Sequence, residues 1–206
     1  MRNAQSSCKV SLPTRRLPSP ADGASPVHGV IFSELRKYVE QRHGGPATWK
    51  SLLHEAGLGR RMYLPVGEYP DADAVALVSA ASAATGVPVR GVLEDFGEFI
   101  APDLMGMYRS LIRPEWRTLD FLEKTEETIH RVVRLKDSDA RPPEIRCART
   151  AANEAVIRYA SARRMCGVAV GIVRGVAAHY GEAVQIDEPR CMHRGDPECE
   201  IRVRVT

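Results

Sequence analysis

The sequence lacks the features that mark exported, membrane-bound or repeat proteins. Its first 26 residues, rich in Ser, Pro and Arg, contain no apolar run long enough for a signal peptide or a membrane anchor. We therefore expect a cytoplasmic protein with no membrane partner. Internal repeats are absent, and there is no low-complexity tract beyond this first segment, so a repeat architecture is excluded.

Surplus charge is also lacking in most of the chain. The formal net charge is +3, but the first 26 residues carry four basic residues against one acidic residue and account for all of it. From residue 27 onward, 25 basic residues face 25 acidic ones. Nucleic-acid binding depends largely on neutralising phosphates. A neutral domain is a poor nucleic-acid binder, and we expect no such partner.

Catalytic arrangements are missing as well. The sequence shows no paired carboxylates and no Ser/His/Asp set that would support acid–base or nucleophilic chemistry. Asp95 and Glu98 lie at helical spacing near Phe96, but a solvated helix face explains them. We therefore expect that the protein is not an enzyme.

What the sequence does contain is enough apolar material for one core. The chain has 206 residues, of which 44% are hydrophobic, and this predicts a single domain. We assign the domain to residues 27–206. Residues 1–26 are interpreted as a disordered tail, or as sequence upstream of the true translation start.

Apolar spacing predicts helices first and strands later. Helices are expected from Val30 to the Gly44-Gly45 pair, then at about 46–57, 71–81, 89–100, 105–111 and 118–135. After Pro142-Pro143, strands are expected at 144–149, 154–160, 183–189 and 198–205, with a helix at 163–180. The predicted fold class is α+β, with an N-terminal helical subdomain followed by a mainly antiparallel four-stranded sheet and one long packed helix.

One short motif suggests anion binding. Tyr159, Ser161 and Arg163 are spaced two apart, and in a strand this period puts all three on one face. A phenol, a hydroxyl and a guanidinium form a clamp for a carboxylate or phosphate. His130 lies near the end of the long predicted helix, and a histidine aimed at the same ligand would suggest that the ligand carries a metal.

Four segments resemble one protein family in order and separation. They are the opening HGVIFSELRKYVEQRHG, the helix histidine in ETIHRVVR, the RPPEIRC segment and the YASARRM motif. From Val27 to the end, the chain resembles the H-NOX (haem nitric oxide/oxygen binding) domains, in the bacterial stand-alone type related to the sensor region of soluble guanylate cyclase. The resemblance implies haem b held between the helical half and the sheet half.

The resemblance also assigns roles by position. His130 resembles the proximal haem ligand, and Pro143 the proline that presses on the porphyrin. Tyr159, Ser161 and Arg163 resemble the clamp on the haem propionates, which agrees with the chemistry of the motif.

The choice of gas depends on the opposite face of the haem. Oxygen-binding members of this family use a distal tyrosine, and the matching position here is Val168. An apolar pocket favours NO and CO over O2, because bound O2 gains from a hydrogen-bond donor. Tyr38 and Tyr108 remain open as alternative donors. The resemblance further implies that gas binding releases His130, and that a separate histidine kinase or cyclic-di-GMP enzyme receives the signal.

Cysteines suggest a second site. Cys191 and Cys199 flank a short loop between two predicted strands, and Cys166 lies on the predicted helix nearby. Clustered thiols in a cytosolic protein more often form a metal or redox site than structural disulfides. Some bacterial H-NOX proteins resemble this chain in carrying a zinc-binding, oxidation-sensitive cysteine loop. We expect these three thiols to bind zinc, with Cys147 or His193 as the fourth ligand.

The alternative function is therefore a zinc and cysteine redox sensor on the same fold, in which thiol oxidation is the main input. A free, partly buried set of thiols is also compatible with the spacing, since no Cys-x-x-Cys motif is present.

Overall fold

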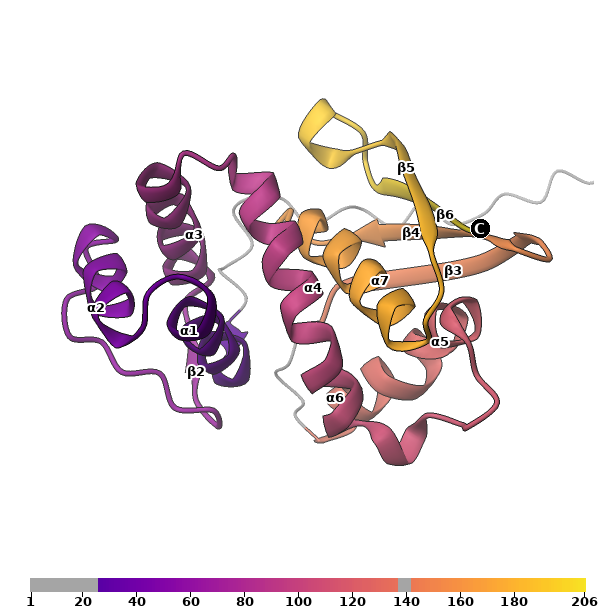
Figure 1. Ribbon diagram of the computed structural model, residues 1–206, viewed down its shortest axis with the longest axis horizontal. Coiled ribbons are helices and arrows are strands. Elements are labelled where there is room, and N and C mark those ends of the chain that lie inside the picture. The colour runs from indigo at the N-terminus through magenta and orange to yellow at the C-terminus, as the bar shows by residue number, and fades with distance from the viewer. Residues whose placement is uncertain (1–25, 137–141) are drawn as a thin grey trace, which may run out of the picture.

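The computed structural model describes residues 26–136 and 142–206. The predicted tail therefore lies outside the described residues, except for Pro26. Figure 1 shows the N-terminal helices at one end of the molecule and a sheet at the other, with two long helices, α4 and α7, lying side by side between them. The predicted α+β class is confirmed.

The N-terminal half is helical, as predicted. It contains β1 (Val27–His28), α1 (Gly29–Arg42), α2 (Pro46–Glu55), β2 (Glu68–Tyr69), α3 (Asp71–Thr85) and α4 (Val89–Met107). Local signals set several boundaries. Pro46 occupies the first turn of α2, where its missing N–H costs nothing. Gly86 ends α3 with a left-handed φ of 72°. An apolar cluster including Phe32, Leu77 and Ile100 joins these helices.

Helix α4 is longer than the sequence suggested. The predicted end at Ile100 is wrong, because the helix continues through Pro102 to Met107. A proline removes one backbone donor and favours a break, but here the apolar stripe continues past it. Ala101 and Met105 are 1% and 4% exposed, and burying them favours the helix. Only a short 3-10 turn, η1 (Arg109–Leu111), remains of the separate helix expected there.

The long helix predicted near residues 118–135 is present in three parts. These are α5 (Thr118–Thr125), the π-helical turn η2 (Glu126–His130) and α6 (Arg131–Lys136). The π turn contains His130. π-helical turns within α-helices are rare and occur frequently at functional sites.

The C-terminal half is an antiparallel sheet in the order β3-β4-β6-β5. Its strands are β3 (Glu144–Ala151), β4 (Glu154–Ala160), β5 (Val184–Arg190) and β6 (Cys199–Val205), and η3 (Met192–Arg194) lies between the last two. Helix α7 (Cys166–His179) covers one face of the sheet (Figure 1). Its buried valines share one core cluster with Ile157, Ile201 and Val203.

Helices α4 and α7 pack backbone against backbone. A Cβ atom on Gly171 would lie 2.0 Å from the carbonyl oxygen of Glu94, and one on Gly97 would lie 2.3 Å from that of Val168. Only glycine allows this approach. The contact fixes the first turn of α7 against the helical half of the molecule.

Within residues 26–136 and 142–206, no single helix is long and apolar enough to cross a membrane. Helices α3 and α4 reach the required length and composition only as a pair, across a bend of 108°.

Candidate functional site

His130 has the surroundings of a metal-binding histidine. Its side chain is 14% exposed, and Nδ1 lies 2.8 Å from Oε2 of Glu126. The other oxygen of Glu126 accepts a hydrogen bond from Arg134 at 2.6 Å. Metal-binding histidines usually donate the second ring nitrogen to a carboxylate, which fixes the tautomer. Glu126 therefore orients the ring and leaves Nε2 as the nitrogen that can bind a metal.

Protonation of His130 is disfavoured. Burial lowers the pKa of His130, and the hydrogen bond to Glu126 opposes that shift only in part. The neutral imidazole is the form that coordinates a metal. Glu126 was not predicted as the partner of His130. Its position four residues earlier is nevertheless the spacing at which helical side chains meet.

Pro143 lies half-buried directly before β3. The chain that joins it to α6 is outside the described residues. Ile145 and Cys147, which follow on β3, pack on the same core cluster as Ile129, the neighbour of His130. Pro143 is therefore at the start of the strand that packs beside the His130 turn.

The predicted anion clamp of Tyr159, Ser161 and Arg163 does lie close together, but not because the three residues share one face of a strand. Strand β4 ends at Ala160, so the strand-face argument is wrong for Ser161 and Arg163. Both lie in a turn that contains Arg164 with a left-handed φ of 52°. Within this turn the backbone N–H of Arg163 donates to Oγ of Ser161 at 3.3 Å. The predicted helix start at residue 163 is wrong for the same reason, and α7 begins at Cys166.

Tyr159 and Arg163 supply a donor and a cation at this end of β4. Tyr159 is 4% exposed, and burial raises its pKa to about 12, against a hydrogen bond to Ser161 that lowers it. The phenol is therefore protonated and can donate. Arg163 Nη2 donates to the carbonyl of Pro26 at 2.8 Å, which brings the start of the domain to this turn. These residues suit a ligand that carries carboxylates.

Val168 faces the helical half. It packs against the cluster of Val78, Val92 and Leu93, and also against the N-terminal cluster that contains Phe96. Val168 is therefore surrounded by apolar side chains on this side. Of the alternative donors, Tyr38 belongs to the N-terminal cluster, whereas Tyr108 packs on the sheet-side cluster.

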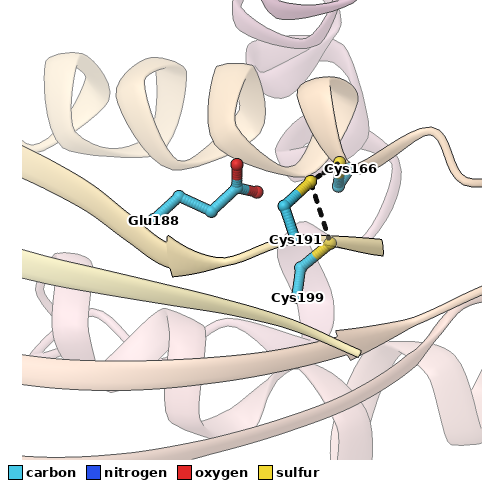
Figure 2. Close-up of side chains that lie close together, drawn as sticks. All are labelled: Cys166, Glu188, Cys191 and Cys199. Atoms are coloured by element: carbon cyan, nitrogen blue, oxygen red, sulfur yellow. Dashed lines mark hydrogen bonds between the residues drawn. The ribbon is translucent and has the colours of Figure 1, made fainter. Parts of the chain in front are cut away.

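Three buried thiols form the second site (Figure 2). Sγ of Cys191 lies 3.7 Å from Sγ of Cys166 and 3.7 Å from Sγ of Cys199. Tetrahedral zinc with Zn–S bonds of about 2.3 Å places its sulfurs about 3.8 Å apart. The spacing of the thiols therefore matches a zinc site.

The loop holds these sulfurs in place through its backbone. The N–H of Cys191 donates to Asp196 at 2.8 Å, and the N–H of Met192 donates to Sγ of Cys199 at 3.3 Å. Burial raises the pKa of Cys166 and of Cys199. Burial therefore disfavours the thiolates of Cys166 and Cys199, and a bound cation would favour them.

The fourth group near the thiols is Glu188. Its carboxylate and the three sulfurs all lie within 4.8 Å of one another, whereas Cys147 and His193 do not belong to this set in the part of the chain that the structure describes. Nε2 of His193 lies instead 2.6 Å from the carbonyl of Arg164. The sequence does contain a signal for the position of Glu188, because it lies on the same face of β5 as Val184 and Ile186, at a spacing of two residues.

Comparisons with known proteins agree with this architecture. The haem-NO-binding domain model matches residues 28–188. An H-NOX protein from S. oneidensis in the Fe(II)NO state superimposes with a TM-score of 0.81 at 24% identity, covering 87% of this chain and 99% of that chain.

Two further structures give similar values. The S. oneidensis H-NOX domain in the Fe(II)CO state has a TM-score of 0.78 at 24% identity, with coverage of 87% and 99%. The unliganded Fe(II) H-NOX protein from K. algicida has a TM-score of 0.77 at 22% identity, with coverage of 87% and 97%. A search of curated proteins gave no match. The family match extends over most of the described fold, and the chain belongs to the haem-NO-binding (H-NOX) family, whose fold is that of a haem-based gas sensor.

Proposed function

We propose that residues 27–206 form a sensor that binds haem b and detects NO and CO. The observation that carries the proposal is His130, a largely buried imidazole whose pKa is lowered by burial, whose Nδ1 is held by Glu126 and whose Nε2 remains for a metal. When bound, haem supplies the ferrous iron at which diatomic gases bind. Tyr159, Ser161 and Arg163 are proposed to hold its propionates, and Pro143 to press on the porphyrin.

Val168 supports the choice of gas. An aliphatic side chain offers no hydrogen bond to bound O2, whereas NO needs none. Relatives of this fold have been observed with NO and with CO, and we extend these ligands to the present chain. Tyr63 is unsuitable as a donor to a gas, because its hydroxyl already donates a hydrogen bond to Oδ2 of Asp73 at 2.9 Å.

The output in this proposal is a change of shape without turnover. Release of His130 on gas binding would leave the π-helical turn that bears it free to move relative to the sheet. A two-state element of this kind can be detected by a partner protein. We propose a separate histidine kinase or cyclic-di-GMP enzyme as that partner.

Absorption spectra test the haem proposal. Reduced protein reconstituted with haem should show a Soret band that shifts when NO is added. His130→Gln should lose or strongly weaken haem binding, whereas the matched control His54→Gln, at an exposed position on α2, should keep it. Equal haem retention by the two variants would reject His130 as the ligand.

A second input is supported by the thiol cluster. We propose that Cys166, Cys191 and Cys199 bind zinc, and that a peroxide-type oxidant releases it by taking two electrons from two of the thiolates, which then form a disulfide. Metal analysis of reduced protein should give about one zinc per chain, and a stoichiometry near zero would reject this site. Regulation of a partner by a His130 variant at wild-type levels would favour thiol oxidation as the main input.

A further inference from the structure

Glu188 is a buried carboxylate with one oxygen in use. Its side chain is 7% exposed, and Oε2 accepts a hydrogen bond from Nη1 of Arg90 at 2.5 Å. Oε1 is also buried, and within the described residues it has no hydrogen-bond partner. Leaving a buried acceptor unsatisfied costs about 1–3 kcal/mol, and more for a charged group. The ion pair with Arg90 therefore satisfies only one of the two carboxylate oxygens of Glu188.

The carboxylate points toward the three thiols (Figure 2). Three sulfur ligands leave one position of a tetrahedral zinc site to be filled, and a carboxylate oxygen is an accepted zinc ligand. Cys147 lies on the edge strand β3, and His193 is bound to the carbonyl of Arg164. Glu188 is the group that the fold directs at the open position.

Charge balance supports the same assignment. Three thiolates and a carboxylate around a divalent cation leave two negative charges, which are costly to bury without compensation. Two guanidinium groups approach Glu188. Arg90 pairs with Oε2, while Arg194 has Nη1 3.9 Å from Oε2 and donates Nη2 to the backbone carbonyl of Glu188 at 2.5 Å. Their two positive charges offset the surplus.

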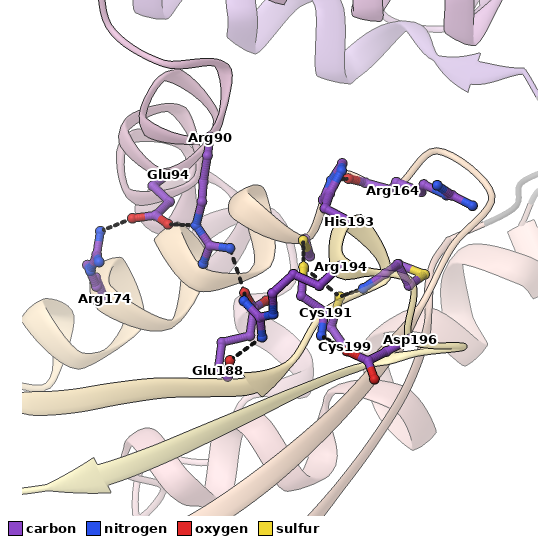
Figure 3. Close-up of polar contacts among 12 residues, drawn as sticks. Arg90, Glu94, Arg164, Arg174, Glu188, Cys191, His193, Arg194, Asp196 and Cys199 are labelled. Carbon is purple, nitrogen blue, oxygen red and sulfur yellow. Dashed lines mark hydrogen bonds and ion pairs between the residues drawn. The ribbon is translucent and has the colours of Figure 1, made fainter.

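We propose that Glu188 is the fourth ligand of the metal site, giving a Cys3Glu set, and that its contact with Arg90 links metal occupancy to helix α4. This inference rests on the proposed zinc site. Arg90 lies in the first turn of α4 and also pairs with Glu94 at 2.7 Å, which in turn binds Arg174 of α7 at 2.8 Å (Figure 3). Metal binding orders Glu188, and Glu188 then holds Arg90 and the start of α4.

Substitutions test whether Glu188 acts as a zinc ligand or only as the ion-pair partner of Arg90. Full-length reduced protein is titrated with Zn2+ against a chromophoric chelator. Glu188→Gln should lower zinc affinity about 10- to 100-fold, a range typical of lost supporting groups at metal sites. The matched control Glu94→Gln removes an acid that pairs with Arg90 but is not directed at the thiols, and it should bind zinc like the wild type.

Glu188→His provides the second arm, because imidazole binds zinc well but cannot replace the carboxylate at Arg90. This variant should keep zinc affinity within about tenfold of the wild type. Hydrogen exchange of residues 89–95 should slow on zinc binding in the wild type and not in Glu188→His.

The outcomes distinguish the two proposals. Absence of zinc from the wild-type protein would overturn the zinc site itself and the role of Glu188 with it. Zinc binding by the wild type and by Glu188→Gln with equal affinity would overturn the ligand assignment and leave the thiol site standing. Zinc-dependent protection of α4 that persists in Glu188→His would overturn the link through Arg90.

Discussion

Replacing Gly171 by alanine should destabilise the protein at the contact between its two halves. The added Cβ would lie 2.0 Å from the carbonyl oxygen of Glu94 and 2.7 Å from the backbone nitrogen of Glu98. Both neighbours are backbone atoms of α4 and cannot rotate away, so the helices must separate. Such overpacking costs about 1–3 kcal/mol, occasionally more.

Helix propensity acts in the opposite direction. Alanine is about 1 kcal/mol better than glycine in a helix interior. A contact of 2.0 Å between the added Cβ and a backbone oxygen belongs at the upper end of the overpacking range, so we expect a net loss of about 2 kcal/mol. For a domain of this size, that corresponds to a fall in Tm of about 4–8 °C. Urea unfolding followed by circular dichroism measures the loss directly.

Gly106 in α4 provides the control. A Cβ at this position meets no atom within 4 Å, so Gly106→Ala should leave stability unchanged or raise it by up to about 1 kcal/mol. If Gly171→Ala proved as stable as Gly106→Ala, the close approach of α4 and α7 would be refuted, together with the placement of Val168 and Cys166 that depends on it.

Three further outcomes are expected. Glu126→Gln should weaken haem retention about 10- to 100-fold, measured by transfer of haem to apomyoglobin, because the neutral amide orients His130 less firmly; unchanged retention would contradict the role of Glu126. Burial raises the pKa of Cys147 to about 12, so its alkylation at pH 8 should be about a thousandfold slower than that of a free thiol. The rate, followed by mass spectrometry, should rise about tenfold per pH unit toward pH 12. A rate that levels off below pH 10 would contradict the raised pKa. Tyr159→Phe should cost about 1 kcal/mol through the lost hydrogen bond to Ser161 and should speed haem loss, whereas wild-type values in both assays would remove Tyr159 from the site.

The order of elements could be predicted because it depends on local signals. Strand β4 has the predicted bounds, Glu154–Ala160, since alternation between two turn signals defines a strand well. The π turn at Glu126–His130 could not be predicted, because an extra residue in a helical turn hardly changes the spacing of apolar side chains. The continuation of α4 past Pro102 depended on burial against other elements, which periodicity alone does not reveal.

Some residues of the candidate site could likewise be predicted from the sequence, whereas others could not. Residue type and the family resemblance led us to propose His130 and the three thiols as site residues, because a histidine or a cysteine carries its chemistry wherever it lies. The partners that orient them were missed. Glu188 lies on β5, and it lies beside Cys166 only after α7 has packed on the sheet. Its link to Arg90 joins positions 98 residues apart in the chain, and no local pattern contains such a contact.

The π-helical turn gives the proposed signal a defined direction. Relative to a regular α-helix, one residue more is wound into the turn that ends at His130. If that turn relaxed to α-helical hydrogen bonding after His130 was released, everything beyond it would screw about 100° around the helix axis and advance about 1.5 Å. Helix α6 carries three exposed basic side chains, Arg131, Arg134 and Lys136. These side chains would then point in new directions, and a partner could recognise the ligand state from the orientation of this one short helix.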